Sequence, residues 1–241
     1  MGKMYIFGRN SVKAALQEHQ VQHLFINASL HDIEIDKLIS SAKCSFERVD
    51  SSLLAKLSMG GNHQGLVAEV NTFSYTSFDE IIKKAKEKKY PLILILAELN
   101  DPHNLGAIIR TADAFGVDGI VIKKTNQVGV TPTVIKVATG AQQYVPIAQV
   151  TNLAASIQTL KEAGFWIVAS DGKANQTYDM VRYDTPTGLI VGSEGFGIPE
   201  LLLKKSDFIV KIPMVGHVNS LNASVAAGIL VAGIRFLQNN Y

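Results

Sequence analysis

Three segments of this 241-residue chain place polar residues and glycines directly after apolar, strand-like runs. In the first, residues 98–106, Asn104 stands at the start of a helical pattern that also contains Arg110. Arg110 follows Asn104 by six residues, nearly two helical turns, so we expect the two side chains on roughly one side of the helix. A capping amide and a surface arginine would account for the same two residues. The segment can therefore present a guanidinium beside an amide, but these two residues by themselves do not indicate a functional site.

The second segment, residues 192–200, gathers glycines around one acidic side chain. Gly192, Gly195 and Gly197 fall within six residues, and glycines let backbone N–H groups approach a ligand closely. No Gly-Lys-Ser/Thr follows, which excludes a Walker loop, and Glu200 occupies the third glycine position of a dinucleotide fingerprint. Glu194 within the turn is a poor neighbour for phosphate, so the segment favours a ligand without phosphate.

The third segment, residues 212–224, brings Ser220 and Asn222 to the start of the last helical pattern. Hydroxyl and amide groups at that position can cap the helix, whatever else they do. The helix itself is rich in alanine and glycine, which fits either a tightly buried helix or a helix at a dimer interface.

These segments belong to an alternation of strand-like and helical patterns after residue 90. The apolar runs are typical of strands buried on both faces of a parallel sheet, and they lie at 92–97, 119–122, 166–169, 188–191 and 208–212. Helical patterns separate them at 105–115, 132–139, 153–163 and 199–204, and the last runs from 221 to about 237. The pattern predicts an open α/β domain, whose ligands usually bind at the carboxyl ends of the strands.

The first 72 residues form a separate pattern. Helices at 11–18, 36–43 and 51–57 mix with strands at 23–27, 45–49 and 65–70, which predicts a small α/β module. Basic and acidic residues balance in 1–72 and in 91–241, so the net charge of +2 comes from 73–90, where five lysines face three acids. We interpret 73–90 as a solvated helix or linker between domains, with an RNA-binding tract as the alternative.

Composition excludes several other classes of protein. The chain is 47% hydrophobic and 18% charged, and its apolar runs are far shorter than the ~18 residues of a membrane span, so we expect neither disorder nor a transmembrane helix. No signal-peptide pattern follows Met1, and the single cysteine excludes a disulfide framework and a cysteine-based zinc site. His103 and His217 lack a second ligand at metal spacing. We expect a soluble, cytoplasmic protein without a metal.

Together, the three segments resemble the three motifs of the SpoU/TrmH class of SPOUT RNA methyltransferases, in the same order and at about the same spacing. The matching stretches are 104–112, 192–195, 212–214 and 220–222. Residues 8–12 and 62–65 resemble the ribosomal-protein-like RNA-binding domain attached to many members. The resemblance covers essentially the whole chain and implies an RNA substrate-binding domain (1–72), a linker (73–90) and a SPOUT methyltransferase domain (91–241).

The resemblance implies a fold and a reaction. The fold is α/β: a C-terminal SPOUT domain, whose parallel sheet carries a deep trefoil knot, and a small N-terminal α/β domain. Ordinary topology rules would argue against such a knot. Members transfer a methyl group from S-adenosylmethionine to a ribose 2′-hydroxyl of RNA. They act as homodimers with the final helix at the interface.

Residue by residue, the resemblance assigns roles to three groups of side chains. The catalytic arginine is Arg110, and the other polar groups of the site are Asn104, Glu194, Ser220 and Asn222. The cofactor contacts lie in the loops of the knot, at Gly192, Gly197, Thr139, Gly140, Ile212, Met214 and Leu221. The candidates for RNA contacts in the first domain are Arg9, Lys13 and His63.

Three alternatives stay open. Within the family, the full accessory domain favours a guanosine of large-subunit ribosomal RNA, as in the RlmB-type branch, and transfer RNA is the other possible substrate. A protein of another class would be an RNA-binding or scaffold protein with an inactive catalytic domain, although such a protein need not keep Arg110 and Glu194. A nucleotide-dependent dehydrogenase on an ordinary α/β sheet would need the glycine fingerprint that is missing here.

Overall fold

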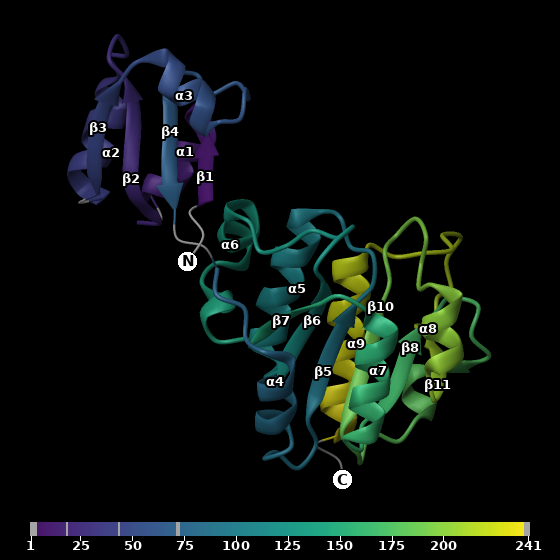
Figure 1. Ribbon diagram of the computed structural model, residues 1–241. Helices are drawn as coiled ribbons and strands as arrows, with labels where there is room; N and C mark the ends of the chain where they lie inside the picture. Colours follow the sequence, from purple (N-terminus) through teal and green to yellow (C-terminus); the bar gives the residue numbers. More distant parts are fainter. Residues whose placement is uncertain (1–3, 18, 43, 71–72, 239–241) are drawn as a thin grey trace. The chain divides into compact units, whose positions relative to one another are not determined.

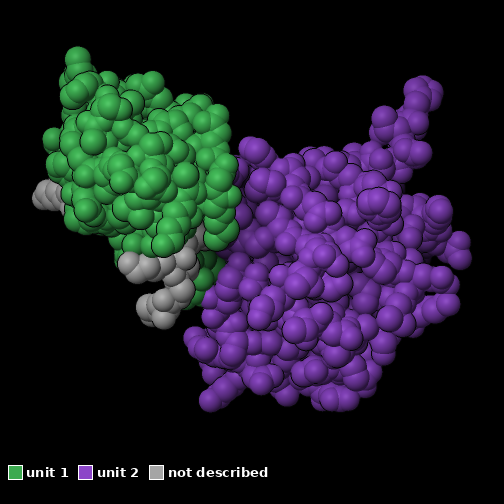
Figure 2. Space-filling model, turned by 45° about the horizontal axis from the view of Figure 1, so that its top comes forward, with its two compact units in different colours: residues 1–74 green, residues 75–241 purple. Residues whose placement is uncertain are grey.

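The computed structural model describes residues 4–17, 19–42, 44–70 and 73–238. The chain divides into two compact units, residues 1–74 and 75–241 (Figure 2). The first unit contains a four-stranded sheet and the second a seven-stranded sheet, and each sheet has a hydrophobic core of its own.

The first unit is a mixed sheet with helices packed on both faces (Figure 1). Its strands are β1 (Met4–Phe7), β2 (Val21–Asn27), β3 (Ser45–Val49) and β4 (Leu66–Val70), in the order β1-β4-β2-β3. β4 pairs antiparallel with β1 and β2, whereas β2 and β3 are parallel. Helices α1 (Arg9–Gln17) and α2 (Ile33–Ala42) cover one face, and α3 (Ser51–Leu57) packs on the other.

Local capping sets where these helices begin. α3 begins at Ser51, as predicted, because the Asp50 side chain accepts a hydrogen bond from the Leu53 N–H at 2.9 Å. α2 begins at Ile33, three residues before the predicted start, because Asp32 accepts the Glu34 N–H at 3.0 Å. The sequence did not predict β1, a four-residue run whose pairing partner β4 lies far along the chain.

The second unit has a seven-stranded sheet in the order β7-β6-β5-β10-β8-β11-β9. Every neighbouring pair is parallel, which confirms the prediction from the buried apolar runs. The strands are β5 (Leu92–Leu96), β6 (Gly119–Lys123), β7 (Ile147–Val150), β8 (Trp166–Ser170), β9 (Gln176–Thr177), β10 (Thr187–Val191) and β11 (Phe208–Lys211). The sequence did not predict β7 and β9, because both are short and contain glutamine.

Helices cover both faces of this sheet (Figure 1). α4 (Phe78–Ala85), α7 (Leu153–Glu162) and α8 (Glu200–Lys205) share one core, in which Ile81, Ile157 and Leu202 contact residues of the strands. On the other side, α5 (Pro102–Ala114) packs against α6 (Pro132–Ala138) and against the long α9 (Ala223–Gln238). No helix in the described part of the chain is long and apolar enough to cross a bilayer.

The segment 73–90, expected to be a solvated helix or linker, contains α4 and belongs largely to the second unit. α4 begins after Ser77, whose hydroxyl accepts the Glu80 N–H at 3.2 Å. Ile81 is fully buried in the core of the second sheet, while Lys84 stays on the solvent side and pairs with Glu80 at 2.8 Å. The segment thus contains a helix with solvent-facing lysines, and its isoleucines, which precede the lysines in the sequence, attach the helix to the sheet.

The strand order brings distant parts of the chain to one edge of the second sheet. β10 lies between β5 and β8, and β11 lies on the far side of β8. Because these strands are parallel, their carboxyl ends meet at the same edge, and the segments that follow β8, β10 and β11 come together there. This edge is where an open α/β sheet usually binds its ligand. The trefoil knot stays a prediction.

Candidate functional site

A cavity of about 290 Å³ opens at the carboxyl ends of β8, β10 and β11. This volume is close to the lower end, roughly 300 Å³, of small-molecule sites in proteins. The lining residues come from the turn after β8, the glycine turn after β10 and the segment that joins β11 to α9: 170–173, 191–198, 212, 214, 219–221, 223 and 226. The edge that the sequence predicted to bind a ligand therefore does contain a cavity.

Five of the seven predicted cofactor contacts line this cavity: Gly192, Gly197, Ile212, Met214 and Leu221. The predicted catalytic residues Glu194 and Ser220 line it as well. Thr139 and Gly140 do not. They end α6 with positive φ angles of 52° and 94°, and α6 follows β6, whereas the cavity is built from β8, β10 and β11.

The glycine turn after β10 has no room for side chains at its base. A Cβ atom on Gly192 would lie 2.3 Å from the carbonyl carbon of Gly197, which real Cβ atoms essentially never do. The Gly197 N–H donates to the Ser193 carbonyl oxygen at 2.9 Å and closes the turn, and Gly197 has a φ of +67° that favours glycine. The Ser193 hydroxyl lines the cavity, and its oxygen is buried without a hydrogen-bond partner among the described residues. A ligand in the cavity would supply that partner.

Glu194 joins three parts of the second unit through one carboxylate oxygen. Its Oε1 accepts the Asn104 side-chain amide at 3.1 Å and the backbone N–H of Ala223 at 3.1 Å. It also accepts the side-chain amide of Asn222. The carboxylate thus lies at the N-terminus of α9, where the helix dipole favours a negative charge. The predicted trio of Asn104, Glu194 and Asn222 is a real hydrogen-bonded cluster.

Asn222 both caps α9 and completes this cluster. Its Oδ1 accepts the N–H groups of Ser224 at 3.0 Å and Val225 at 3.3 Å, so the predicted capping role is confirmed. Its amide donates to the Asn104 Oδ1 at 2.9 Å. One side chain therefore fixes the start of α9 and links it to α5.

Asn104 and Arg110 have different environments, contrary to the expectation that they lie on one side of α5. Asp101, not Asn104, caps this helix, because its side chain accepts the His103 N–H at 2.9 Å; this hydrogen bond also lowers the pKa of the Asp101 carboxyl. Asn104 is 8% exposed inside the first turns. Because a step of six residues rotates the side chain about 120° around the helix axis, Arg110 points to a different side of α5 from Asn104. Arg110 is exposed and lies outside the cavity lining.

Sequence reasoning missed the turn after β8. Residues 170–173 line the cavity, and the turn contains a carboxylate, Asp171, and an amine, Lys173. The Asp171 side chain accepts the backbone N–H of Lys173 at 2.7 Å. The sequence does contain a feature that could have identified this turn: the polar residues directly follow a buried parallel strand, as the other two lining segments do.

Comparison with known proteins identifies the chain. Residues 91–232, which include every residue of the cavity lining, match the SpoU rRNA Methylase family. The chain belongs to the SpoU rRNA methylase family. Residues 5–76 of this SpoU-family chain match a second family, described as RNA 2′-O ribose methyltransferase substrate binding.

Relatives of this SpoU-family chain agree with it over nearly its full length. A protein of Staphylococcus saprophyticus is 42% identical over 100% of this chain and 98% of its own length, and one of Bacillus subtilis, YacO, is 42% identical over 94% and 93%. Both are named TrmH family tRNA/rRNA methyltransferases. The SpoU methyltransferase AviRb of Streptomyces viridochromogenes, crystallised with its cofactor AdoMet, shares the fold with a TM-score of 0.67 at 22% identity, over 100% of this chain and 92% of that chain.

The protein is an S-adenosylmethionine-dependent RNA methyltransferase of the TrmH/SpoU family. The cavity suits this donor, which carries a methyl group on a positively charged sulfonium. Gly192 and Gly197 leave the backbone accessible, the Ser193 hydroxyl needs a partner, and the Asp171 carboxylate offers a negative charge. These residues would hold the donor beside the cluster formed by Asn104, Glu194 and Asn222.

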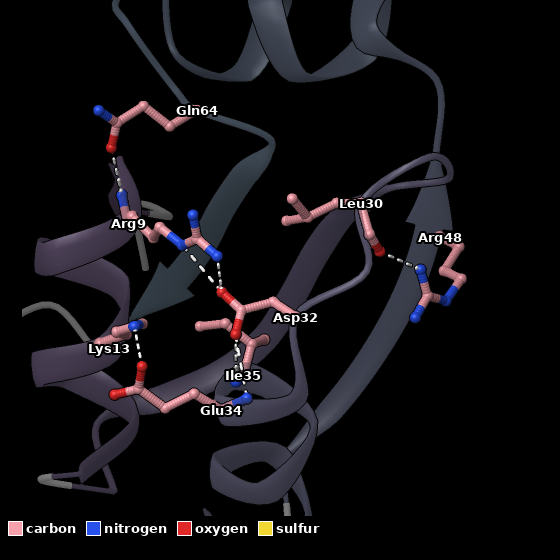
Figure 3. Close-up of polar contacts among 8 residues, drawn as sticks. All are labelled: Arg9, Lys13, Leu30, Asp32, Glu34, Ile35, Arg48 and Gln64. Carbon is pink, nitrogen blue, oxygen red and sulfur yellow. Dashed lines mark hydrogen bonds and ion pairs between the residues drawn. The ribbon is translucent and has the colours of Figure 1, made fainter.

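In the first unit of this SpoU-family enzyme, the three candidate RNA contacts all have partners within the unit, and Figure 3 shows those of Arg9 and Lys13. Arg9 of α1 donates through Nε to Asp32 at 2.8 Å, and its guanidinium holds the pKa of that carboxyl below its usual range. Lys13 pairs with Glu34 at the start of α2. The Nδ1 of His63 accepts the Gly65 N–H at 3.1 Å. These residues connect α1 to α2 and shape a turn.

Among the described residues, no group of three His, Cys, Asp or Glu side chains could hold a metal ion. His103 lies beside Asp101 at 3.1 Å near the start of α5, and His217 is exposed in the segment before α9. Neither histidine lines the cavity.

Proposed function

We propose that this enzyme methylates the ribose 2′-hydroxyl of a guanosine in large-subunit ribosomal RNA. The observation that carries the proposal is a donor cavity next to an amide–carboxylate cluster, in a chain whose first unit matches a 2′-O-ribose substrate-binding family. Amide and carboxylate groups suit a neutral hydroxyl acceptor, since they can donate and accept hydrogen bonds without a permanent positive charge.

Arg110 supplies the positive charge of the proposed reaction. A guanidinium has a pKa above ~12 and no lone pair for a proton, so it cannot act as the base. It can stabilise the alkoxide that develops on the ribose oxygen and hold the neighbouring phosphate, while phosphate or water takes the proton. Arg110 is exposed and makes no hydrogen bond or ion pair with any described residue, so the group is available to RNA.

The proposed active form is a homodimer with α9 at the interface. Val225, Ile229 and Phe236 are 49%, 37% and 70% exposed and lie on one side of α9. The small residues of α9 permit a close helix contact. We expect sedimentation velocity to give a dimer for the wild type and a monomer for Phe236→Glu, because a charge there would be buried in the interface; a wild-type monomer would contradict the proposal.

Two RNA classes compete for this site, and in vitro methylation separates them. Transcripts of large-subunit ribosomal RNA and a pool of transfer RNAs would be incubated with labelled S-adenosylmethionine, and the modified nucleotide would be located by nuclease digestion and mass spectrometry. We expect 2′-O-methylguanosine in the ribosomal RNA. A product in transfer RNA, or methylation of a base, would overturn the assignment. If neither RNA is methylated although calorimetry detects donor binding, the inactive scaffold protein becomes the better description.

A further inference from the structure

Phe196 lies at the tip of the glycine turn and has an unusual exposure for a large aromatic residue. It lines the donor cavity, yet it is 86% exposed. Gly195 and Gly197 flank it, so the neighbouring residues have no side chains that could cover the ring. A single exposed apolar residue is ordinary on a protein surface. An exposed ring at the mouth of a ligand cavity is less ordinary, since its position allows contact with whatever enters.

The backbone beneath this ring is held in place. The Gly197 N–H bonds to the Ser193 carbonyl at 2.9 Å, and Gly192 packs against the Gly197 backbone without room for a methyl group. Glu194, two residues before the ring, is fixed by its hydrogen bonds to Asn104 and to the start of α9. A flat group on a fixed support loses little conformational entropy when a ligand stacks on it.

The segment after β11 also brings an apolar side chain to the cavity, but this side chain has no ring. Met214 lines the cavity and is 37% exposed, and Val215 next to it is fully exposed. An aliphatic side chain offers contact area, whereas an aromatic ring also offers a flat face for stacking. Of the residues that line the cavity, Phe196 alone combines an aromatic ring with high exposure.

The geometry of a ribose acceptor decides which ligand group meets this ring. The donor occupies the cavity, and the accepting hydroxyl must approach from its mouth, so the base on the same ribose stays at the rim. Sequence-selective proteins commonly bind unpaired RNA bases by stacking them on aromatic side chains. Phe196 lines the cavity and is 86% exposed, so it offers such a ring at the rim.

We propose that Phe196 is the stacking surface for the base of the target nucleotide. The inference rests on the proposed ribose acceptor, because that acceptor places a base at the rim. Stacking needs the face of the ring and no hydrogen bond, so Phe196 contributes affinity for an extruded base, and the choice of base is made elsewhere in the site.

Steady-state methylation by the full-length enzyme tests this proposal with three substitutions at one position. Phe196→Ala removes the ring, Phe196→Leu keeps apolar volume without a flat face, and Phe196→Tyr keeps the ring. We expect the KM for RNA to rise roughly tenfold in the first two variants and by less than about twofold in the third, as the loss of one base–aromatic stack predicts. The kcat should change much less, because the contact is present in both ground and transition states.

Calorimetric titration with S-adenosylmethionine and a control substitution at Val215, which lies outside the cavity lining, complete the experiment. The Kd for the donor should stay within about twofold in all variants, and Val215→Ala should leave both constants unchanged because it removes no ring. A KM for RNA in Phe196→Leu equal to that of the wild type would overturn the proposal, as would a donor Kd that rises as much as the RNA KM. If the wild type methylates a base instead of a ribose, the proposed acceptor fails and this inference fails with it; a ribose product with unchanged variants rejects the inference alone.

Discussion

The cations that the resemblance assigns to RNA binding or catalysis have opposite environments in the two units. In the first unit, Arg9 and Lys13 pair with Asp32 and Glu34, and Arg48 donates to the Leu30 carbonyl oxygen at 2.9 Å (Figure 3). In the second unit, Arg110 is exposed and has no such partner among the described residues. A cation with a carboxylate already beside it must give up that interaction before it binds a phosphate. A cation without one is free to meet RNA, so residue type alone is a poor guide to RNA contacts.

The largest expected effect comes from Arg110. We expect Arg110→Ala and Arg110→Lys to lower kcat by about 100-fold or more, because each removes the fork of donors that meets the developing charge and the phosphate. Donor binding measured by calorimetry should survive, since Arg110 does not line the cavity. Arg182→Ala, at an arginine side chain that is 72% exposed and paired with Asp184, serves as the control and should keep its rate. Full activity in Arg110→Ala would refute the assignment.

The next effect concerns the amide that links α5 to α9. We expect Asn222→Ala to lower the free energy of unfolding by about 1 kcal/mol through loss of the cap, and to reduce kcat as well because Asn104 and Glu194 lose a partner. Asn152→Ala is the matched control: this side chain caps α7 by accepting the Ala154 N–H at 2.9 Å. Urea unfolding should show a similar loss in both variants, and only the first should lose turnover. Equal kcat values for the two would leave Asn222 a purely structural role.

A smaller effect is expected for the paired cations of the first unit. Lys13→Ala should weaken RNA binding by at most about threefold, because the ammonium group already pairs with Glu34. Measuring the Kd as a function of salt sharpens the comparison with Arg110, since removing one cation that binds a phosphate reduces the slope of log K against log salt by roughly one. A tenfold weaker Kd with a reduced slope in Lys13→Ala would show that the pair opens to bind RNA, and the contrast between the units would disappear.

The smallest expected effect is a change in the pKa of the Asp32 carboxyl. The Arg9 guanidinium lowers the pKa of the Asp32 carboxyl, with further help from backbone N–H groups at the start of α2. A carboxyl whose folded pKa is lowered contributes stability above its unfolded pKa of about 4, and this contribution is lost as the pH falls through the folded pKa. NMR titration should therefore show a higher Asp32 pKa in Arg9→Ala than in the wild type. An unchanged pKa would mean that the ion pair does not form in solution.

Much of the second unit could be predicted from the sequence because its signals are local. Runs such as 92–96 and 187–191 are apolar on both faces, and that pattern indicates a buried parallel strand wherever it occurs. The three segments that carry the motifs follow such runs or precede a capped helix. The turn at 170–173 follows the same rule and was missed only because its residue types are ordinary.

Other features depended on contacts between distant residues. The sequence predicted Asn104 as the cap of α5, but Asp101 caps this helix. The Asn104 side chain instead bonds to Glu194 and Asn222. The lysines of 73–90 indicated a solvated helix or linker, whereas the burial of Ile81 and Ile82 depends on the sheet of the second unit. In each case, the contact that decides the structure is made with a residue of a different helix, strand or turn.

The sequence by itself determined the α/β class, the parallel strands of the second unit and the residues that could supply chemistry, because strand periodicity, helix caps and motif order are properties of short stretches of chain. Only the tertiary structure decided which of those residues meet. It joined Asn104, Glu194 and Asn222 over a separation of up to 118 residues and placed Arg110 on the exposed side of α5. It also brought Arg9 and Lys13 of α1 next to Asp32 and Glu34 at the start of α2. Hydrogen bonds and ion pairs act over a few ångströms, so the path of the whole chain decides which of them form.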